Sequence, residues 1–207
     1  MRTSFQFTDG WKFHRGDLNE TNYRAIHANR FKRAEWMKAG NHGISRVGYP
    51  DQAWHEVHLP HDFVVAGEYT PAANAVHGSL PTVVGWYHKT FELPAEIRHQ
   101  RNHLEFDGIY RDATIWVNGH LAGSHLSGYT SFSLDVTELC DPNECNAIAV
   151  RCDAQEFELW SYEGGGIYRD VRLVATDDLH VPYSGTCIRS PFPDEADPSQ
   201  VQIELQA

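Results

Sequence analysis

The segment 158–171, ELWSYEGGGIYRDV, gathers most of the side chains in this chain that could do chemistry. Two carboxylates, Glu158 and Glu163, flank Trp160 and Tyr162, and three glycines follow before the next apolar run. Glycosidase catalysis uses two carboxyl groups at a defined separation across the scissile bond. Nothing in the sequence fixes the separation of these two carboxylates, so we expect them to bind hydroxyl groups rather than to transfer protons.

The glycine triplet at 164–166 is open to two interpretations. Glycine permits a positive φ and lets another group approach the backbone closely. It is equally common in an ordinary turn that leads into a strand. A phosphate-binding loop does not fit, because the spacing G-x-x-x-x-G-K and its lysine are absent.

Histidine and cysteine are the usual zinc ligands, and their spacing here does not favour a metal site. His55, His58 and His61 recur at every third position, which would suit a metal-dependent jelly-roll enzyme, but Pro60 ends the extended segment between them. The cysteines lack the tight spacing of a zinc knuckle, and we expect free thiols at Cys140, Cys145, Cys152 and Cys187. We therefore assign no metal ligand in this chain.

The composition is that of an ordinary globular protein, with 41% apolar and 22% charged residues. The net charge of −11, with no cluster of lysine and arginine, disfavours nucleic acid and anionic membranes as partners. Residues 1–20 lack the apolar run of a signal peptide, and no stretch approaches the roughly 20 apolar residues that span a membrane. These features lead us to expect a cytoplasmic protein.

Short segments with period-two alternation predict the frame that would position these side chains. Within one of them, Asn118-Gly119 separates two alternating runs, which is typical of a tight hairpin. Cys152 continues the alternation of Ile148 and Val150, so we expect it in the core. Strands at this spacing, with no helices between them, predict an all-β sandwich or jelly roll. The segments are 85–93, 103–108, 113–125, 129–136, 146–153 and 166–175.

The first 85 residues are less regular. Residues 22–38 are predicted to form one short helix, and residues 54–63 a strand that runs into a proline-fixed turn. Residues 64–84 are expected to form an extended loop. The tripeptide Arg15-Gly16-Asp17 is expected to be a turn.

The C-terminal residues predict the beginning of a second unit. Residues 186–190 and 201–207 have the pattern of two strands, and two strands cannot bury a core by themselves. We therefore divide the chain into a domain at 1–181 and the start of an incomplete sandwich at 182–207.

Eight motifs in their order along the chain resemble the N-terminal sugar-binding domain of glycoside hydrolase family two, closest to its β-galactosidase-like members. They are WKF (11–13), LPHDF (59–63), HGSLP (77–81), GWYHKTFELP (85–94), FDGIYRDATIWVNG (106–119), GYTSFSLDVT (128–137), AVRCD (149–153) and WSYEGGGIYRDVRL (160–173). Each motif alone is a weak signal, and the eight together are highly specific.

The resemblance implies a galactose-binding-like jelly-roll sandwich, followed by an immunoglobulin-like sandwich that would open at 182–207, and then a (β/α)8 barrel. In the family the barrel carries both catalytic glutamates of a retaining mechanism. The resemblance therefore implies no catalytic residue in this chain, which we expect to be inactive alone. It implies no cofactor here and leaves metal binding to the full enzyme.

In the family this domain lends loops to the mouth of the active site, and two loops match. One follows FDG and holds Tyr110 and Arg111, with Tyr110 in the place of a substrate-contacting asparagine of the bacterial lactose-cleaving enzymes. The other begins at Asp153, near the position of an aspartate that contacts galactose in those enzymes. We therefore predict substrate-binding roles for Asp153, Glu158, Tyr162, Glu163, Tyr110 and Arg111.

The function predicted from these residues is an accessory sugar-binding domain of a retaining glycoside hydrolase, in the first instance a β-galactosidase. Its expected partners are a β-galactoside or related carbohydrate and the immunoglobulin-like and barrel domains of a longer parent, with a homo-oligomer left open. The alternatives are a free-standing carbohydrate-binding module and a metal-dependent jelly-roll enzyme. Glucuronidases and mannosidases share much of this domain, so the sugar and linkage stay open.

Overall fold

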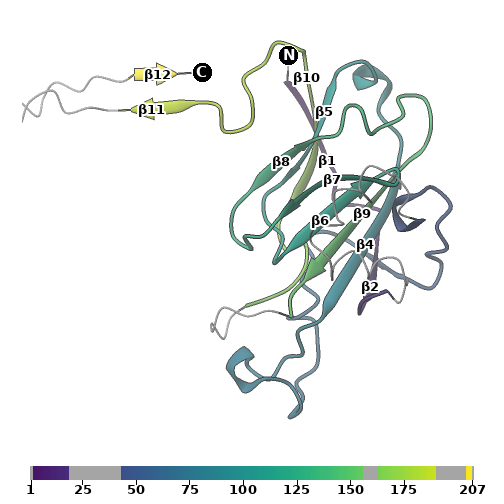
Figure 1. Cartoon of the computed structure of the whole chain (residues 1–207), viewed down its shortest axis with the longest axis vertical. Helices are drawn as coiled ribbons and strands as arrows, with labels where there is room; N and C mark the ends of the chain where they lie inside the picture. Colours follow the sequence, from purple (N-terminus) through teal and green to yellow (C-terminus); the bar gives the residue numbers. More distant parts are fainter. Residues whose placement is uncertain (1, 19–42, 156–162, 190–203, 207) are drawn as a thin grey trace, which may run out of the picture.

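The computed structural model describes residues 2–18, 43–155, 163–189 and 204–206, and the predicted β-sandwich is confirmed (Figure 1). Its two main sheets are antiparallel throughout the paired strands of these ranges. The smaller sheet has the order β1 (Arg2–Gln6), β10 (Val171–Thr176), β5 (Arg101–Phe106) and β8 (Phe132–Asp135). The larger has the order β3 (His55–Val57), β2 (Trp11–Arg15), β4 (Val84–Phe91), β9 (Asn146–Asp153), β6 (Ala113–Val117) and β7 (His120–His125).

The hydrophobic core lies between these sheets, because alternate residues of each strand point to the same face. Tyr87, Ile115 and Val150 of the larger sheet and Leu104 and Leu173 of the smaller sheet all belong to it and are buried. Burial of each such side chain stabilises the fold by about 1.5–3 kcal/mol. The core also contains Cys152, as the alternation in β9 predicted.

The outer face of the larger sheet is buried as well. Trp86 of β4 and Trp116 of β6 stack with ring centroids 5.6 Å apart and an interplanar angle of 21°. Both strands pair with β9, which lies between them, so the rings meet over that strand, where Ala149 belongs to the same cluster. Ile44, from the short 3-10 helix η1 (Gly43–Ser45), covers this face. The central strands of the larger sheet are therefore buried on both faces.

Most predicted strands are present, with differences at their ends. Two strands near the N-terminus, β1 and β2, were not predicted. β1 alternates only between exposed and half-buried positions and shows no apolar period. β2 does alternate, with Trp11 and Phe13 buried, but over only five residues. The strand predicted at 54–63 is limited to β3, and the one predicted at 166–175 begins only at Val171. The helix predicted at 22–38 lies outside the described residues.

The remaining elements are short. Two further 3-10 helices, η2 (Ala75–His77) and η3 (Ala95–Ile97), lie in connections. Strands β11 (Cys187–Arg189) and β12 (Glu204–Gln206) pair in an antiparallel sheet of their own, which Figure 1 shows beside the sandwich. The predicted pair of C-terminal strands is thus present, and its assignment to an immunoglobulin-like unit stays a prediction. Among the helices described, none is long and apolar enough to cross a membrane.

The sandwich core should dominate the stability of the chain. Leu104 is fully buried on the inner face of β5, so Leu104→Ala should lower the free energy of unfolding by about 2–5 kcal/mol. Leu179 is 95% exposed, and Leu179→Ala, the matched control, should change it by less than about 0.5 kcal/mol. Urea unfolding of both variants measures the two losses in free energy of unfolding. Equal losses would contradict the position of Leu104 in the core.

Candidate functional site

Loops from five parts of the chain meet at one end of the sandwich, which we call the loop end. It comprises residues 61–66, 107–112, 126–131, 153–155 and 163–170. Backbone hydrogen bonds join these loops. The Asp153 amide donates to the Arg111 carbonyl at 2.9 Å, the Tyr110 amide to the Gly166 carbonyl at 2.9 Å, and the Phe63 amide to the Gly165 carbonyl at 2.8 Å. The two loops that the sequence predicted to serve one site therefore lie together.

Tyr110 is buried within the loop end, with only 4% of its surface exposed. Its ring makes an edge contact with Tyr129 at 5.5 Å and packs so closely on Gly128 that no Cβ would fit there. Its backbone forms an isolated bridge with Gly166. In this structure Tyr110 packs inside the loop end, and the neighbouring Arg111 lies half-buried beside Asp153.

Asp153, the last residue of β9, is partly exposed at the loop end. Its Oδ1 accepts a hydrogen bond from the Gln155 amide at 3.1 Å, and its Oδ2 lies 2.9 Å from Nη2 of Arg151. The carboxylate is therefore held at both oxygens and still faces solvent. An ionised carboxylate has about four acceptor sites, so capacity for further donors remains.

Arg151 connects Asp153 to a second carboxylate that sequence reasoning did not assign to the site. Its Nη2 also lies 3.2 Å from Oδ2 of Asp17, whose Oδ1 accepts from the Trp86 indole at 3.0 Å. Burial opposes ionisation of Asp17, but these hydrogen bonds, from Trp86 and then Arg151, hold the pKa of its carboxyl below the ordinary value. Asp17 stood in a tripeptide expected only to turn, and no local signal linked it to Arg151.

The glycine triplet packs against the segment 61–64. Oδ1 of Asp62 accepts from the Gly165 amide at 3.0 Å and also from the amides of Val64 and Val65. Gly166 has a φ of +118°, and a Cβ there would meet the Tyr87 hydroxyl and the His61 carbonyl. The close approach and the positive φ that glycine permits therefore both serve the packing of the triplet against the segment 61–64.

Of the carboxylate pair in this segment, only one member is described. Glu163 is buried beside the glycines. Glu158, Trp160 and Tyr162 lie outside the described residues, so their predicted roles stay predictions.

Exposed apolar side chains lie within the loop end and just beyond it, and sequence analysis did not single them out. Tyr129 and Leu126 belong to the loop after β7, and Val65 and Tyr69 follow the segment 61–64. Aromatic faces of this kind suit the apolar C–H face of a sugar ring. Their signal in the sequence was weak, because each stands alone in a loop without period.

The three histidines at every third position contact different partners. His55 pairs in register with Phe13, Nε2 of His58 lies 2.9 Å from Asp9, and Nδ1 of His61 lies 2.8 Å from the Tyr87 hydroxyl. Burial lowers the pKa of His61, against the opposing charge of Asp62. In the described part of the chain, no three His, Cys, Asp or Glu side chains are grouped so that they could hold a metal ion.

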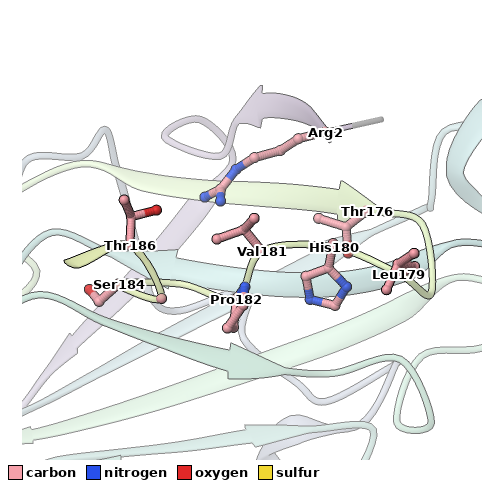
Figure 2. Close-up of a pocket in the computed structure, with 9 residues that line it drawn as sticks. Arg2, Thr176, Leu179, His180, Val181, Pro182, Ser184 and Thr186 are labelled. Atoms are coloured by element: carbon pink, nitrogen blue, oxygen red, sulfur yellow. The ribbon is translucent and has the colours of Figure 1, made fainter. Parts of the chain in front are cut away.

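A cavity of about 500 Å³ lies at the opposite end of the sandwich. Figure 2 shows the side chains that line it, among them Arg2 of β1, Thr176 of β10 and His180. None of the predicted site residues that the structure describes contributes to it. The loop end, rather than this cavity, therefore holds the chemistry that the sequence indicated.

Comparison with known families identifies one match. The family model described as "Glycosyl hydrolases family 2, sugar binding domain" matches residues 68–177, which is more than half of the chain.

Similar curated proteins are glycosidases much longer than this chain. "Beta-galactosidase BoGH2A" of Bacteroides ovatus is 35% identical over 168 residues, which cover 78% of this chain and 20% of that protein. A "Putative beta-glucuronidase" of Formosa agariphila is 29% identical over 152 residues, which cover 72% of this chain and 14% of that protein. The chain therefore spans about a fifth or less of the length of these relatives.

Solved structures show the same fold. A beta-glycosidase from Bacteroides vulgatus superposes with a TM-score of 0.76 at 30% identity, covering 99% of this chain and 24% of that one. A family 2 member from Bacteroides cellulosilyticus superposes with a TM-score of 0.70 at 30% identity, covering 91% and 23%.

Gly166 should be intolerant of any side chain, for two separate reasons. Gly166→Ala incurs the cost of an alanine at positive φ, about 1 kcal/mol, and a clash with the His61 carbonyl only 2.7 Å away, which should add about 1–3 kcal/mol. Gly48 also has a positive φ, +87°, but nothing lies within 4 Å of its Cβ position, so Gly48→Ala should incur the first cost alone. Urea unfolding compares the two, and equal losses would argue against close packing at the triplet.

Proposed function

The chain belongs to the sugar-binding domain family of the family 2 glycosyl hydrolases, and on that premise we propose that it is an accessory domain of a retaining β-glycosidase. The loop end would form part of the substrate pocket of that enzyme. The catalytic carboxylates would lie elsewhere in the parent protein. The observation that carries the proposal is the position of Asp153, a fixed and partly exposed carboxylate beside Arg111 where the two matched loops meet.

The chemistry of the loop end suits a carbohydrate. The Asp153 carboxylate can accept hydrogen bonds from a pair of sugar hydroxyls, and charge-assisted hydrogen bonds of this kind are stronger than neutral ones. The exposed aromatic side chains of Tyr129, within the loop end, and of Tyr69, three residues after its segment 61–66, offer surfaces for the apolar face of a sugar ring. Fixed polar groups beside such surfaces are usual in ligand sites.

Among substrates of the family, we propose a β-galactoside over a β-glucuronide. Two carboxylates and one guanidinium meet in the Asp17–Arg151–Asp153 network, which therefore carries a net charge of −1. A glucuronide carries its own carboxylate, and a like charge near Asp153 would weaken its binding. The 35% identity to a protein named as a β-galactosidase supports the same choice.

An accessory domain is favoured over a free-standing carbohydrate-binding module. The matched relatives extend far beyond the matched region, since the chain covers only 20% of the Bacteroides ovatus protein. Part of a pocket also leaves most of a sugar in water, whereas ligand sites bury most of their ligand. The loop end alone is therefore proposed to bind sugar weakly.

The chain alone should neither hydrolyse a glycoside nor bind one tightly. Purified chain should release no nitrophenol from an aryl β-galactoside, because the proposal puts the catalytic carboxylates outside it. Calorimetric titration with galactose should give a dissociation constant no tighter than about 1 mM. Turnover by contaminant-free chain would contradict the proposal directly.

In the longer parent enzyme, Asp153→Ala should impair catalysis without unfolding the protein. We expect kcat/KM for an aryl β-galactoside to fall about tenfold or more, since a hydrogen bond to a charged group is worth that much. The melting temperature should change little, because Asp153 is partly exposed and lies outside both apolar clusters.

Asp141→Ala provides the matched control. Asp141 also accepts a hydrogen bond from the amide two residues ahead, at 2.9 Å, but it precedes β9 whereas Asp153 ends it. Asp141 hydrogen-bonds with Asn146, the first residue of β9, which lies about 23 Å from Asp153 along the eight-residue strand. If both variants kept normal kinetics, Asp153 would be a turn-capping residue and the proposed site would be wrong.

A further inference from the structure

We propose that Arg151 and Asp17 are positioning residues that hold the Asp153 carboxylate in the orientation needed to bind substrate. The inference rests on the proposed function, in which Asp153 contacts the sugar. It assigns a role to Arg151, a buried arginine within an apolar strand, and to Asp17. Asp17 lies 136 positions before Asp153 and belongs to none of the eight motifs.

One nitrogen of Arg151 joins the two carboxylates. Its Nη2 lies 2.9 Å from Oδ2 of Asp153 and 3.2 Å from Oδ2 of Asp17. The Arg151 side chain is only 5% exposed, whereas Asp153 and Asp17 are 21% and 24% exposed. The arginine is thus buried beneath two carboxylates that reach the surface, and its charge is balanced by both.

The outer face of the larger sheet fixes the position of Arg151. In register, Arg151 stands opposite Trp86 of β4 and opposite Thr114 of β6, so it is flanked on both sides by paired strands. All three residues are buried. A side chain held in this way has little freedom to follow a ligand, and its guanidinium can act as a fixed anchor.

Asp17 is fixed independently of Asp153. Gly16, with a φ of +102°, turns the chain after β2, and its amide donates to the Val84 carbonyl at 2.8 Å. Oδ1 of Asp17 then accepts from the Trp86 indole and from the Leu18 amide, both at 3.0 Å. Asp17 is therefore a second fixed carboxylate on the same Arg151 nitrogen that contacts Asp153.

The consequence for Asp153 is a carboxylate ordered before substrate arrives. Each of its oxygens already has one protein donor, Arg151 at Oδ2 and the Gln155 amide at Oδ1. The remaining acceptor sites are then presented in one orientation, and binding is not weakened by the need to order the side chain. Loss of Arg151 would leave Asp153 without its anchor and facing the like charge of Asp17.

A double-mutant cycle in the longer parent enzyme tests the inference. Steady-state kinetics on an aryl β-galactoside would compare the wild type with Arg151→Gln, Asp153→Ala and the double variant. We expect Arg151→Gln to raise KM about tenfold, the effect of one hydrogen bond to a charged group, with kcat nearly unchanged. In the Asp153→Ala background the same change should alter KM less than about twofold, because contacting residues do not act additively.

Two milder variants keep the inference testable if Arg151→Gln does not fold. Arg151→Lys retains the charge but replaces the planar guanidinium, whose Nη2 contacts both carboxylates, with an ammonium group on a flexible stem, so its KM should lie between those of wild type and Arg151→Gln. Asp17→Asn preserves the shape of the side chain and should raise KM about threefold, since one of several hydrogen bonds to the network is weakened. Both effects should vanish in the Asp153→Ala background.

The matched control is Arg101→Gln, which removes an arginine from another ion pair, at 3.0 Å to Asp135, near the opposite end of the sandwich. It should leave KM unchanged. Two outcomes would overturn the positioning role while the proposed function stood. In the first, Asp153→Ala raises KM but Arg151→Gln and Asp17→Asn do not. In the second, Arg151→Gln and Asp17→Asn raise KM by the same factor in the Asp153→Ala background as in the wild type. If Asp153→Ala left kcat/KM unchanged, both would fail.

Discussion

The structure depends on burying both faces of one central strand, β9. Toward the smaller sheet it contributes Ile148, Val150 and Cys152 to the core. Toward the other side it contributes Ala149 and Arg151, under a layer that includes the stacked tryptophans of β4 and β6. A charged arginine is stable there only because carboxylates balance it. The strand thus serves packing along its length and polar chemistry where it ends.

This arrangement explains how the sandwich can fix the position of a carboxylate at the end of a strand, without a rigid loop. Asp153 is the final residue of β9, so its backbone is fixed by pairing with Val84 and by the hydrogen bond that its amide donates to the Arg111 carbonyl. The glycine triplet supplies the complementary constraint, since it allows the segment at 61–64 to pack tightly beneath the same loops. Loops positioned by a rigid scaffold in this way are where binding residues usually lie.

The sequence predicted the strands whose faces differ in polarity and the loops that meet at one end, but not the contacts that join distant parts of the chain. Ile148, Val150 and Cys152 could be assigned to the core because their alternation is local. Arg151, between them, has the pattern of a solvent-facing residue, and only the tertiary layer over the outer face buries it. Asp17 lies 134 positions away from it, so their pairing has no local signature.

Tyr110 could be placed at the loop end, but its burial against Gly128 depends on a loop from another strand.

The stacked tryptophans carry an evolutionary consequence. Trp86 and Trp116 come from strands about 10 Å apart, on either side of β9, and their stacked rings share a buried cluster with the small side chain of Ala149, which stands opposite Trp116. A larger residue at position 149 would occupy the space that the rings share. Positions 86, 116 and 149 should therefore covary across homologous sequences: lineages that lose one indole are free to enlarge residue 149, and lineages that keep both are not.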